Sequence, residues 1–259
     1  MAAGIREQEL AGLRWLVVSG ERTEVFRALG RAAPAEVHAV QDALPERSAL
    51  RRWAATERGR RRVGRLLDAT HAACGRQLAE LRALAAGAGA DFHDLLLANL
   101  RGDLGVDDGT GCTDLGSRRT RSYVAHNEDG APALDGRLLL TLLVDEDVPV
   151  TVQWYPGFLP ANTFTATGHG LVWGINHVQA TRPADAPGRH FVARALQQAP
   201  TLDSAVDHLR TRPCTGTPTT CATCPTRPTR PAPPRTRTTA RGRHTAWASS
   251  RRASPAARS

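Results

Sequence analysis

The sequence contains no lysine, so all 34 basic side chains are arginines. It also lacks any run of 18 apolar residues: the longest, at 138–144, is interrupted by Thr141, which excludes a membrane-spanning helix. The first residues include Glu7 and Glu9 and only a short apolar run, unlike a secretory signal. Five cysteines are a sparse and odd set, which favours a reducing, cytoplasmic location over a disulfide framework.

Acidic residues are absent from the last 49 positions, and this absence explains the formal net charge of +9. Residues 1–210 hold 24 arginines against 25 acidic side chains, whereas residues 211–259 hold ten arginines and no acid. The basic character therefore belongs to the C-terminal segment alone. It does not indicate a globular surface that binds a specific nucleic acid.

The same segment, 211–259, has no Leu, Ile, Val, Met or Phe, and is rich in Thr, Pro, Ala and Arg. Such a composition cannot bury enough apolar surface to offset the ordering of its backbone, so we predict that it is disordered. GC-rich coding DNA read in a shifted frame gives a similar composition. The sequence thus also raises the expectation that 211–259 is an out-of-frame or truncated continuation.

The remaining residues predict an α+β fold with helices, then strands, then helices. Apolar residues recur at helical spacing between 49 and 86, with a possible break at Gly75, and Asp91 caps a further short helix. Additional helices are expected at 23–32, 35–44, 188–199 and 202–210. Strands rich in Val, Leu and Trp are expected at 13–19, 122–126, 137–144, 150–155 and 171–178.

One group of residues whose side chains could take part in catalysis lies where the predicted helices give way to strands. Cys112 follows Gly111, and Asn127 and Asp129 follow 15 and 17 residues later, on one side of a predicted strand. A hairpin running back from Cys112 would set the Asp129 carboxylate beside the thiol. On these residues alone, a buried structural cysteine and a solvated hairpin remain open alternatives.

Three further blocks, 80–101, 155–164 and 170–178, occur in the order found in penicillin acyltransferase-like proteins, which this sequence resembles between about residues 10 and 210. That family comprises autoproteolytic acyl-CoA:6-aminopenicillanate acyltransferases and their bacterial relatives, within the N-terminal-nucleophile hydrolase superfamily. The resemblance implies the four-layer αββα fold of that superfamily, with two antiparallel sheets between helical layers. In this chain the fold would be truncated at its C-terminal side.

The resemblance also implies a chemistry: self-cleavage between Gly111 and Cys112, after which the Cys112 thiol is the nucleophile and its own α-amino group the base. It implies that Asp129 holds that amino group, that Asn176 contributes to the oxyanion hole, and that Asn127 has a supporting role. Residues 1–111 would then be a mostly helical segment retained after cleavage, and 112–210 the start of the catalytic core.

The expected activity is acyl transfer or amide hydrolysis through a thioester at Cys112, acting on a small-molecule acyl amide or acyl donor. No cofactor, metal or membrane partner is expected, although acyl-CoA would be a possible donor. Cys221 and Cys224 resemble half a zinc site without a second pair. Two alternatives stay open: a truncated, inactive relative, and a non-enzymatic protein whose basic segment binds polyanions.

Overall fold

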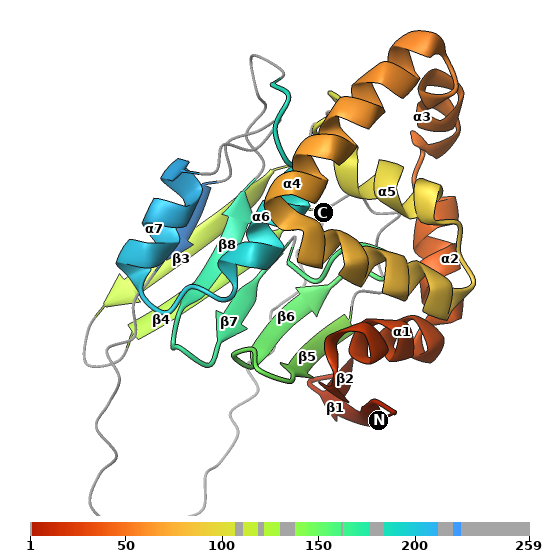
Figure 1. Cartoon of the computed structure of the whole chain (residues 1–259). Coiled ribbons are helices and arrows are strands. Elements are labelled where there is room, and N and C mark those ends of the chain that lie inside the picture. Colours follow the sequence, from red (N-terminus) through yellow and green to blue (C-terminus); the bar gives the residue numbers. More distant parts are fainter. Residues whose placement is uncertain are drawn as a thin grey trace, which may run out of the picture. The chain divides into compact units, whose positions relative to one another are not determined.

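The chain was analysed as a computed structural model, which describes residues 2–106, 111–118, 122–129, 138–161, 163–176, 184–211 and 220–223. It is a mixed α+β structure, as predicted, with a layer of helices packed on a seven-stranded sheet and a separate two-stranded sheet (Figure 1). None of the described helices combines the length and apolar character needed to cross a bilayer.

The predicted helices are present, and capping residues explain where several begin. The Glu21 side chain accepts hydrogen bonds from the backbone at the start of the first helix, and Thr56 and Asp91 do the same for two later ones. The long helix is kinked at Cys74, next to the glycine where a break was expected. The helices are α1 (Arg22–Ala32), α2 (Pro34–Ala43), α3 (Arg47–Ala54), α4 (Glu57–Ala88), α5 (Phe92–Leu100), α6 (Arg189–Leu196) and α7 (Leu202–Thr211).

The large sheet has the strand order β1-β2-β5-β6-β7-β8-β9, and a second sheet contains only β3 and β4. The expectation of purely antiparallel sheets is wrong, because β2 and β5 run parallel. A parallel pair needs a long crossover, and the helices between these two strands supply it. The strands are β1 (Gly4–Leu10), β2 (Leu13–Gly20), β3 (Cys112–Arg118), β4 (Ser122–Glu128), β5 (Leu138–Val144), β6 (Val150–Trp154), β7 (Thr165–Thr167), β8 (Val172–Asn176) and β9 (Thr220–Thr223).

Strand β1 was not predicted, because every residue in it is exposed and its sequence has no apolar alternation. It is the edge partner of β2 and is joined to it by a tight turn at Ala11 and Gly12. Both turn residues have positive φ, of 53° and 80°, which is the conformation that suits a two-residue hairpin and favours glycine.

Two parts of the segment 211–259, which was predicted to be disordered, are among the described residues. Thr211 ends α7, and residues 220–223 form strand β9, which pairs antiparallel with β8. An edge strand is held by backbone hydrogen bonds, so it does not need the aliphatic side chains on which the prediction was based. Residues 212–219 and 224–259 lie outside the described part of the chain.

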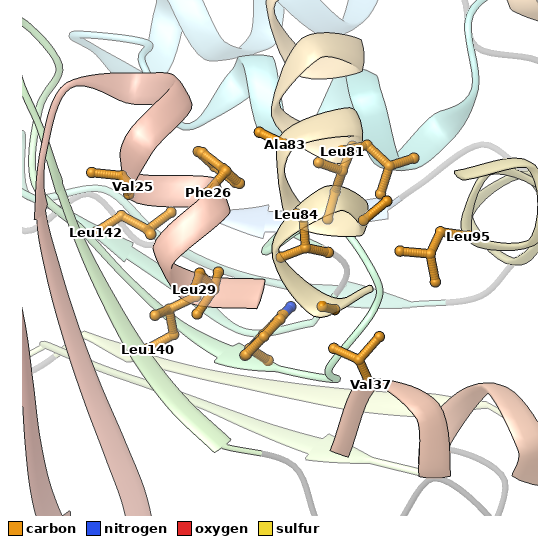
Figure 2. Packing of buried hydrophobic residues seen from close by; sticks show 14 of the residues in the cluster. Val25, Phe26, Leu29, Val37, Leu81, Ala83, Leu84, Leu95, Leu140 and Leu142 are labelled. Atoms are coloured by element: carbon orange, nitrogen blue, oxygen red, sulfur yellow. The ribbon is translucent and has the colours of Figure 1, made fainter. Parts of the chain in front are cut away.

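The main core lies between the large sheet and the helices. Figure 2 shows side chains of α1 directed at Leu140 and Leu142 of β5, with Leu81 and Leu84 of α4 and Leu95 of α5 closing the cluster. Leu140 and Leu142 alternate along β5 with half-buried residues, so one face of the sheet is sealed by helices. The other face is the one available to the two-stranded sheet.

A buried ion-pair network joins the helical layer to the sheet. Glu80 of α4, fully buried, accepts hydrogen bonds from Arg194 Nε at 2.9 Å and Nη2 at 3.1 Å. It also receives Arg22 Nη1 at 2.5 Å, and the other Nη of Arg22 contacts Asp147 in the β5–β6 turn at 2.6 Å. Arg194 Nη1 also donates a hydrogen bond to Gln197 Oε1 at 2.8 Å. One carboxylate therefore links α1, α4 and α6.

A Glu80→Gln substitution tests the importance of this network. Removing the anion leaves Arg194 buried and Arg22 short of a partner, so we expect the free energy of unfolding to fall by about 3–5 kcal/mol. Urea denaturation measures the change. Glu57→Gln is the matched control: Glu57 pairs with Arg61 on the exposed surface of the same helix, and its loss should cost at most about 0.5 kcal/mol. Equal effects would contradict this account.

Asp103, which follows α5, adds a pH-dependent contribution to stability. Its carboxylate is buried and accepts a hydrogen bond from the Arg189 backbone at 3.2 Å, at the start of α6. Burial raises its pKa to about 7 even though Arg189 favours the ionised form. The folded chain thus holds this proton more tightly than the unfolded chain does. The resulting stabilisation is complete below pH ~4 and is lost as the pH rises through about 7.

We therefore expect wild-type protein to lose about 2–3 kcal/mol more stability than Asp103→Asn between pH 5 and pH 8. The asparagine keeps the shape and the acceptor oxygen but cannot ionise. Urea denaturation at both pH values measures the difference, in which the contributions of all other titrating groups cancel. Parallel pH profiles for the two proteins would show that Asp103 has an ordinary pKa.

Candidate functional site

The two-stranded sheet is a hairpin whose inner face carries a cluster of polar side chains. Strands β3 and β4 pair in a register that sets Cys112 opposite Glu128 and Asp114 opposite His126. Side chains alternate between the faces of a strand, so these four lie on the same face. All four are less exposed than their neighbours in sequence. The hairpin contacts β8, the last strand but one of the large sheet.

His126 is the centre of this cluster. Its Nδ1 lies 2.9 Å from Asp114 Oδ1 and its Nε2 lies 2.9 Å from Glu128 Oε2, while only 2% of its side chain is exposed. A hydrogen bond with Cys112, followed by those with Glu128 and Asp114, outweighs the effect of burial and raises the pKa of His126 to about 10. The imidazole is thus a cation at neutral pH and carries a proton on both nitrogens.

Strand β8 supplies the floor of the site. The Asn176 Nδ2 atom donates a hydrogen bond to Asp114 Oδ2 at 2.5 Å. Gly174 lies beneath the same pair: a Cβ atom there would overlap the Asp114 carboxylate and the His126 ring. The absence of a side chain at Gly174 therefore allows the hairpin to approach the large sheet closely.

The structure brings together some of the sequence-predicted site residues and separates others. Cys112 and Asn176 both reach the inner cluster, Asn176 through its bond to Asp114. Asn127 and Asp129 lie on the exposed outer face, where Asn127 Nδ2 donates to Asp129 Oδ1 at 2.6 Å. The predicted hairpin is present, but its register places Glu128, and not Asp129, opposite Cys112. A shift of one residue along a strand is enough to exchange its faces.

Asp114, His126 and Glu128 were not among the predicted site residues. The sequence signal that could have identified them is the alternation of side chains along a strand. Positions 112, 114, 126 and 128 are occupied by residues with reactive or polar side chains, and alternate positions of a two-stranded hairpin share one face. The resemblance directed attention to the odd positions 127 and 129 instead. Sequence spacing does not fix a register, so both faces were equally consistent with the pattern.

A groove of about 400 Å³ lies between the hairpin and the open face of the large sheet and reaches His126. Trp154 and Trp173 are fully buried core residues and do not line this groove. The ring of Phe164 stacks on His126 with 6.1 Å between centroids. The apolar side chains that line the groove include Trp15, Val124, Leu139, Val152 and Phe164, and its polar ones are His126, Thr151 and Gln153.

Among the described residues, one group has the composition of a metal site. Donor atoms of Cys112, His126 and Glu128 all lie within 4.8 Å of one another. Thiolate, imidazole and carboxylate are the usual protein ligands of Zn²⁺. The side chains of the cysteine pair at 221 and 224 lie outside the described part of the structure.

Residues 117–221 match the model of a family described as acyl-coenzyme A:6-aminopenicillanic acid acyl-transferase. The matched segment includes strands β4 to β8 and helices α6 and α7, and Cys112 lies just before it. The match confirms the predicted resemblance to penicillin acyltransferase-like proteins over this part of the chain and supports an acyltransferase-like function. A search of curated proteins finds no match to the sequence.

Gly174→Ala tests the close approach of the hairpin to β8. The added methyl group overlaps the Asp114–His126 pair, so we expect a loss of about 1–3 kcal/mol in the free energy of unfolding, measured in urea. Gly116→Ala is the matched control, because a Cβ at that hairpin position meets nothing within 4 Å. In an Asp114→Ala/His126→Ala background the cost of Gly174→Ala should largely disappear. An undiminished cost there would place the clash elsewhere.

Proposed function

We propose that Cys112 is the nucleophile of an acyltransferase or amidohydrolase that acts on N-acyl amides and matures by cutting its own chain between Gly111 and Cys112. The observation that carries the proposal is the position of Cys112. It opens strand β3, faces His126 and Glu128, and immediately precedes the segment that matches the acyltransferase family. Cys112 is only partly buried, whereas a structural cysteine is usually fully buried.

Self-cleavage begins with attack of the Cys112 sulfur on the Gly111 carbonyl carbon. The peptide C–N bond breaks, its nitrogen takes up a proton, and residues 1–111 become attached to Cys112 as a thioester. Water then hydrolyses the thioester, giving the Gly111 carboxylate, a free thiol and a free α-amino group. Gly111 is exposed and has open space around its Cα, which suits both the transfer of its acyl group from nitrogen to sulfur and the entry of water.

In the mature enzyme the thiol would attack the carbonyl of the substrate, with the new α-amino group as base. His126 is placed to donate a hydrogen bond to the sulfur, and Asp114 and Glu128 hold the ring in position. Glu128, directly across from Cys112, is the nearer carboxylate for the α-amino group, in place of the sequence-predicted Asp129. Asn176 remains our candidate for an oxyanion donor, after release of its bond to Asp114.

The groove is the proposed binding site for the acyl part of the substrate. Its apolar side chains, among them Trp15 and Phe164, offer an apolar surface that ends at His126. An acyl chain lying along the groove would bring its carbonyl carbon to the Cys112 side of the imidazole. Release of the acyl group to water gives hydrolysis, and release to an amine gives transfer.

The proposal includes the four-layer αββα fold of N-terminal-nucleophile hydrolases. The helical layer, the large sheet and the β3–β4 hairpin would be three of its layers. The outer face of the hairpin exposes Leu115 and Tyr123, by 67% and 61%, and this is the face that a second helical layer would cover. Among the described residues, no helix occupies that position.

The test is the intact mass of the purified chain over days at neutral pH. We expect fragments 1–111 and 112–259 to accumulate and to stay together on gel filtration, whereas Cys112→Ala remains uncut. Glu128→Gln and Asp129→Asn are a matched pair of variants that tests which carboxylate holds the α-amino group in the mature enzyme. The first should lower hydrolysis of acyl amides by roughly 100-fold and the second by less than about threefold. Cleavage that persists in Cys112→Ala would overturn the proposal, and the reverse order of the two effects would reassign the carboxylate.

A further inference from the structure

We propose that the inner face of the β3–β4 hairpin contains a Zn²⁺ site, with Cys112, His126 and Glu128 as its three protein ligands. Their donor atoms lie within 4.8 Å of one another. Bound zinc has ligand distances of about 2.0–2.3 Å, so the donors around a tetrahedral ion are separated by roughly 3.3–3.8 Å. Side-chain movements of about 1 Å are therefore enough to bring the three donor atoms to the separations that zinc requires.

The backbone fixes these ligands before any ion arrives. Cys112 and Glu128 are directly opposed across the hairpin, and His126 lies two residues from Glu128 on the same face. Three ligands from two paired strands need little reorganisation, unlike ligands carried by loops.

The orientation of His126 also suits a metal ligand. Its Nδ1 is held by Asp114 Oδ1 at 2.9 Å, and Asp114 is itself held by Asn176 at 2.5 Å. A carboxylate on one ring nitrogen fixes the ring and leaves the other nitrogen for the ion, an arrangement that is common around zinc. Here the second nitrogen, Nε2, lies 2.9 Å from Glu128 Oε2, and a metal ion held by both would replace the proton between them.

The charge of the cluster favours a divalent cation. The Cys112 sulfur and the carboxyl groups of Asp114 and Glu128 surround one imidazole, and a metal ion that binds there would displace protons from its ligands and balance their negative charge. The fourth position would open toward the groove that reaches His126, which leaves room for a water molecule.

Occupation of this site would block the Cys112 sulfur. The binding of zinc stands on the geometry alone, whereas its consequence, reversible arrest of self-cleavage and of acyl transfer, rests on the proposed function. An ion bound to the sulfur withdraws electron density from it and so lowers its nucleophilicity toward a carbonyl carbon, and a chelator would restore the reactive sulfur.

Cobalt substitution tests the site, because Co²⁺ bound to a thiolate gives a sulfur-to-metal charge-transfer absorption. The protein is the full chain in which Cys214, Cys221 and Cys224 are replaced by serine, so that they cannot contribute. We expect one Co²⁺ per chain with this absorption, displaced by Zn²⁺. Cys112→Ser should abolish it, and His126→Gln and Glu128→Gln should weaken binding at least tenfold. Asp129→Asn, on the outer face, should bind as the parent does.

An absorption that survives Cys112→Ser, or binding unchanged in both His126→Gln and Glu128→Gln, would overturn the proposed site. The same samples are followed by intact mass with Zn²⁺ and with a chelator. Zn²⁺ should slow cleavage at least tenfold, and the chelator should restore it. If no cleavage occurs under any condition while the cobalt absorption is present, the proposed function fails and the metal site stands.

Discussion

The buried carboxylate of Glu80 is the interaction on which the arrangement of the molecule depends. It lies in α4 and binds Arg194 of α6 and Arg22 of α1, and Arg22 in turn binds Asp147 at the end of β5. The residues of one pair in this network lie 125 positions apart in the sequence, and the network thus fixes four segments relative to one another. Hydrophobic packing brings helices onto a sheet but is not directional, whereas this ion pair allows only one placement of them.

The sheet positioned in this way offers its open face to the hairpin that carries the candidate site. Contact between them is close because β8 has a glycine, Gly174, where a side chain would meet Asp114 and His126. His126 is consequently enclosed by two carboxylates, a thiol and β8, and its pKa is raised to about 10. Two carboxyl groups and a thiol therefore surround a single imidazole, and this geometry underlies both the proposed activation of Cys112 and the proposed metal site.

Much of the architecture follows from local sequence signals. The cap at Asp91 and the helical spacing of apolar residues located helices, and the apolar strands β2, β5, β6 and β8 were also predicted. Strands β1 and β9 were missed because both are edge strands whose order comes from backbone pairing, which leaves little trace in side-chain composition. The parallel pairing of β2 with β5 likewise depends on contacts between distant segments.

For the candidate site, the sequence by itself determined which chemistry is available: a cysteine after a glycine at the start of a hairpin, carboxylates and a histidine on the returning strand, and a family resemblance confirmed over residues 117–221. Only the tertiary structure decided which of these groups meet. The hairpin register turned Glu128 and His126 toward Cys112 and left Asn127 and Asp129 outside, and the approach of β8 added Asn176 through Asp114. The physical reason is the two-residue period of a strand: residue identity is local, but the face that a residue occupies is set by its pairing partner.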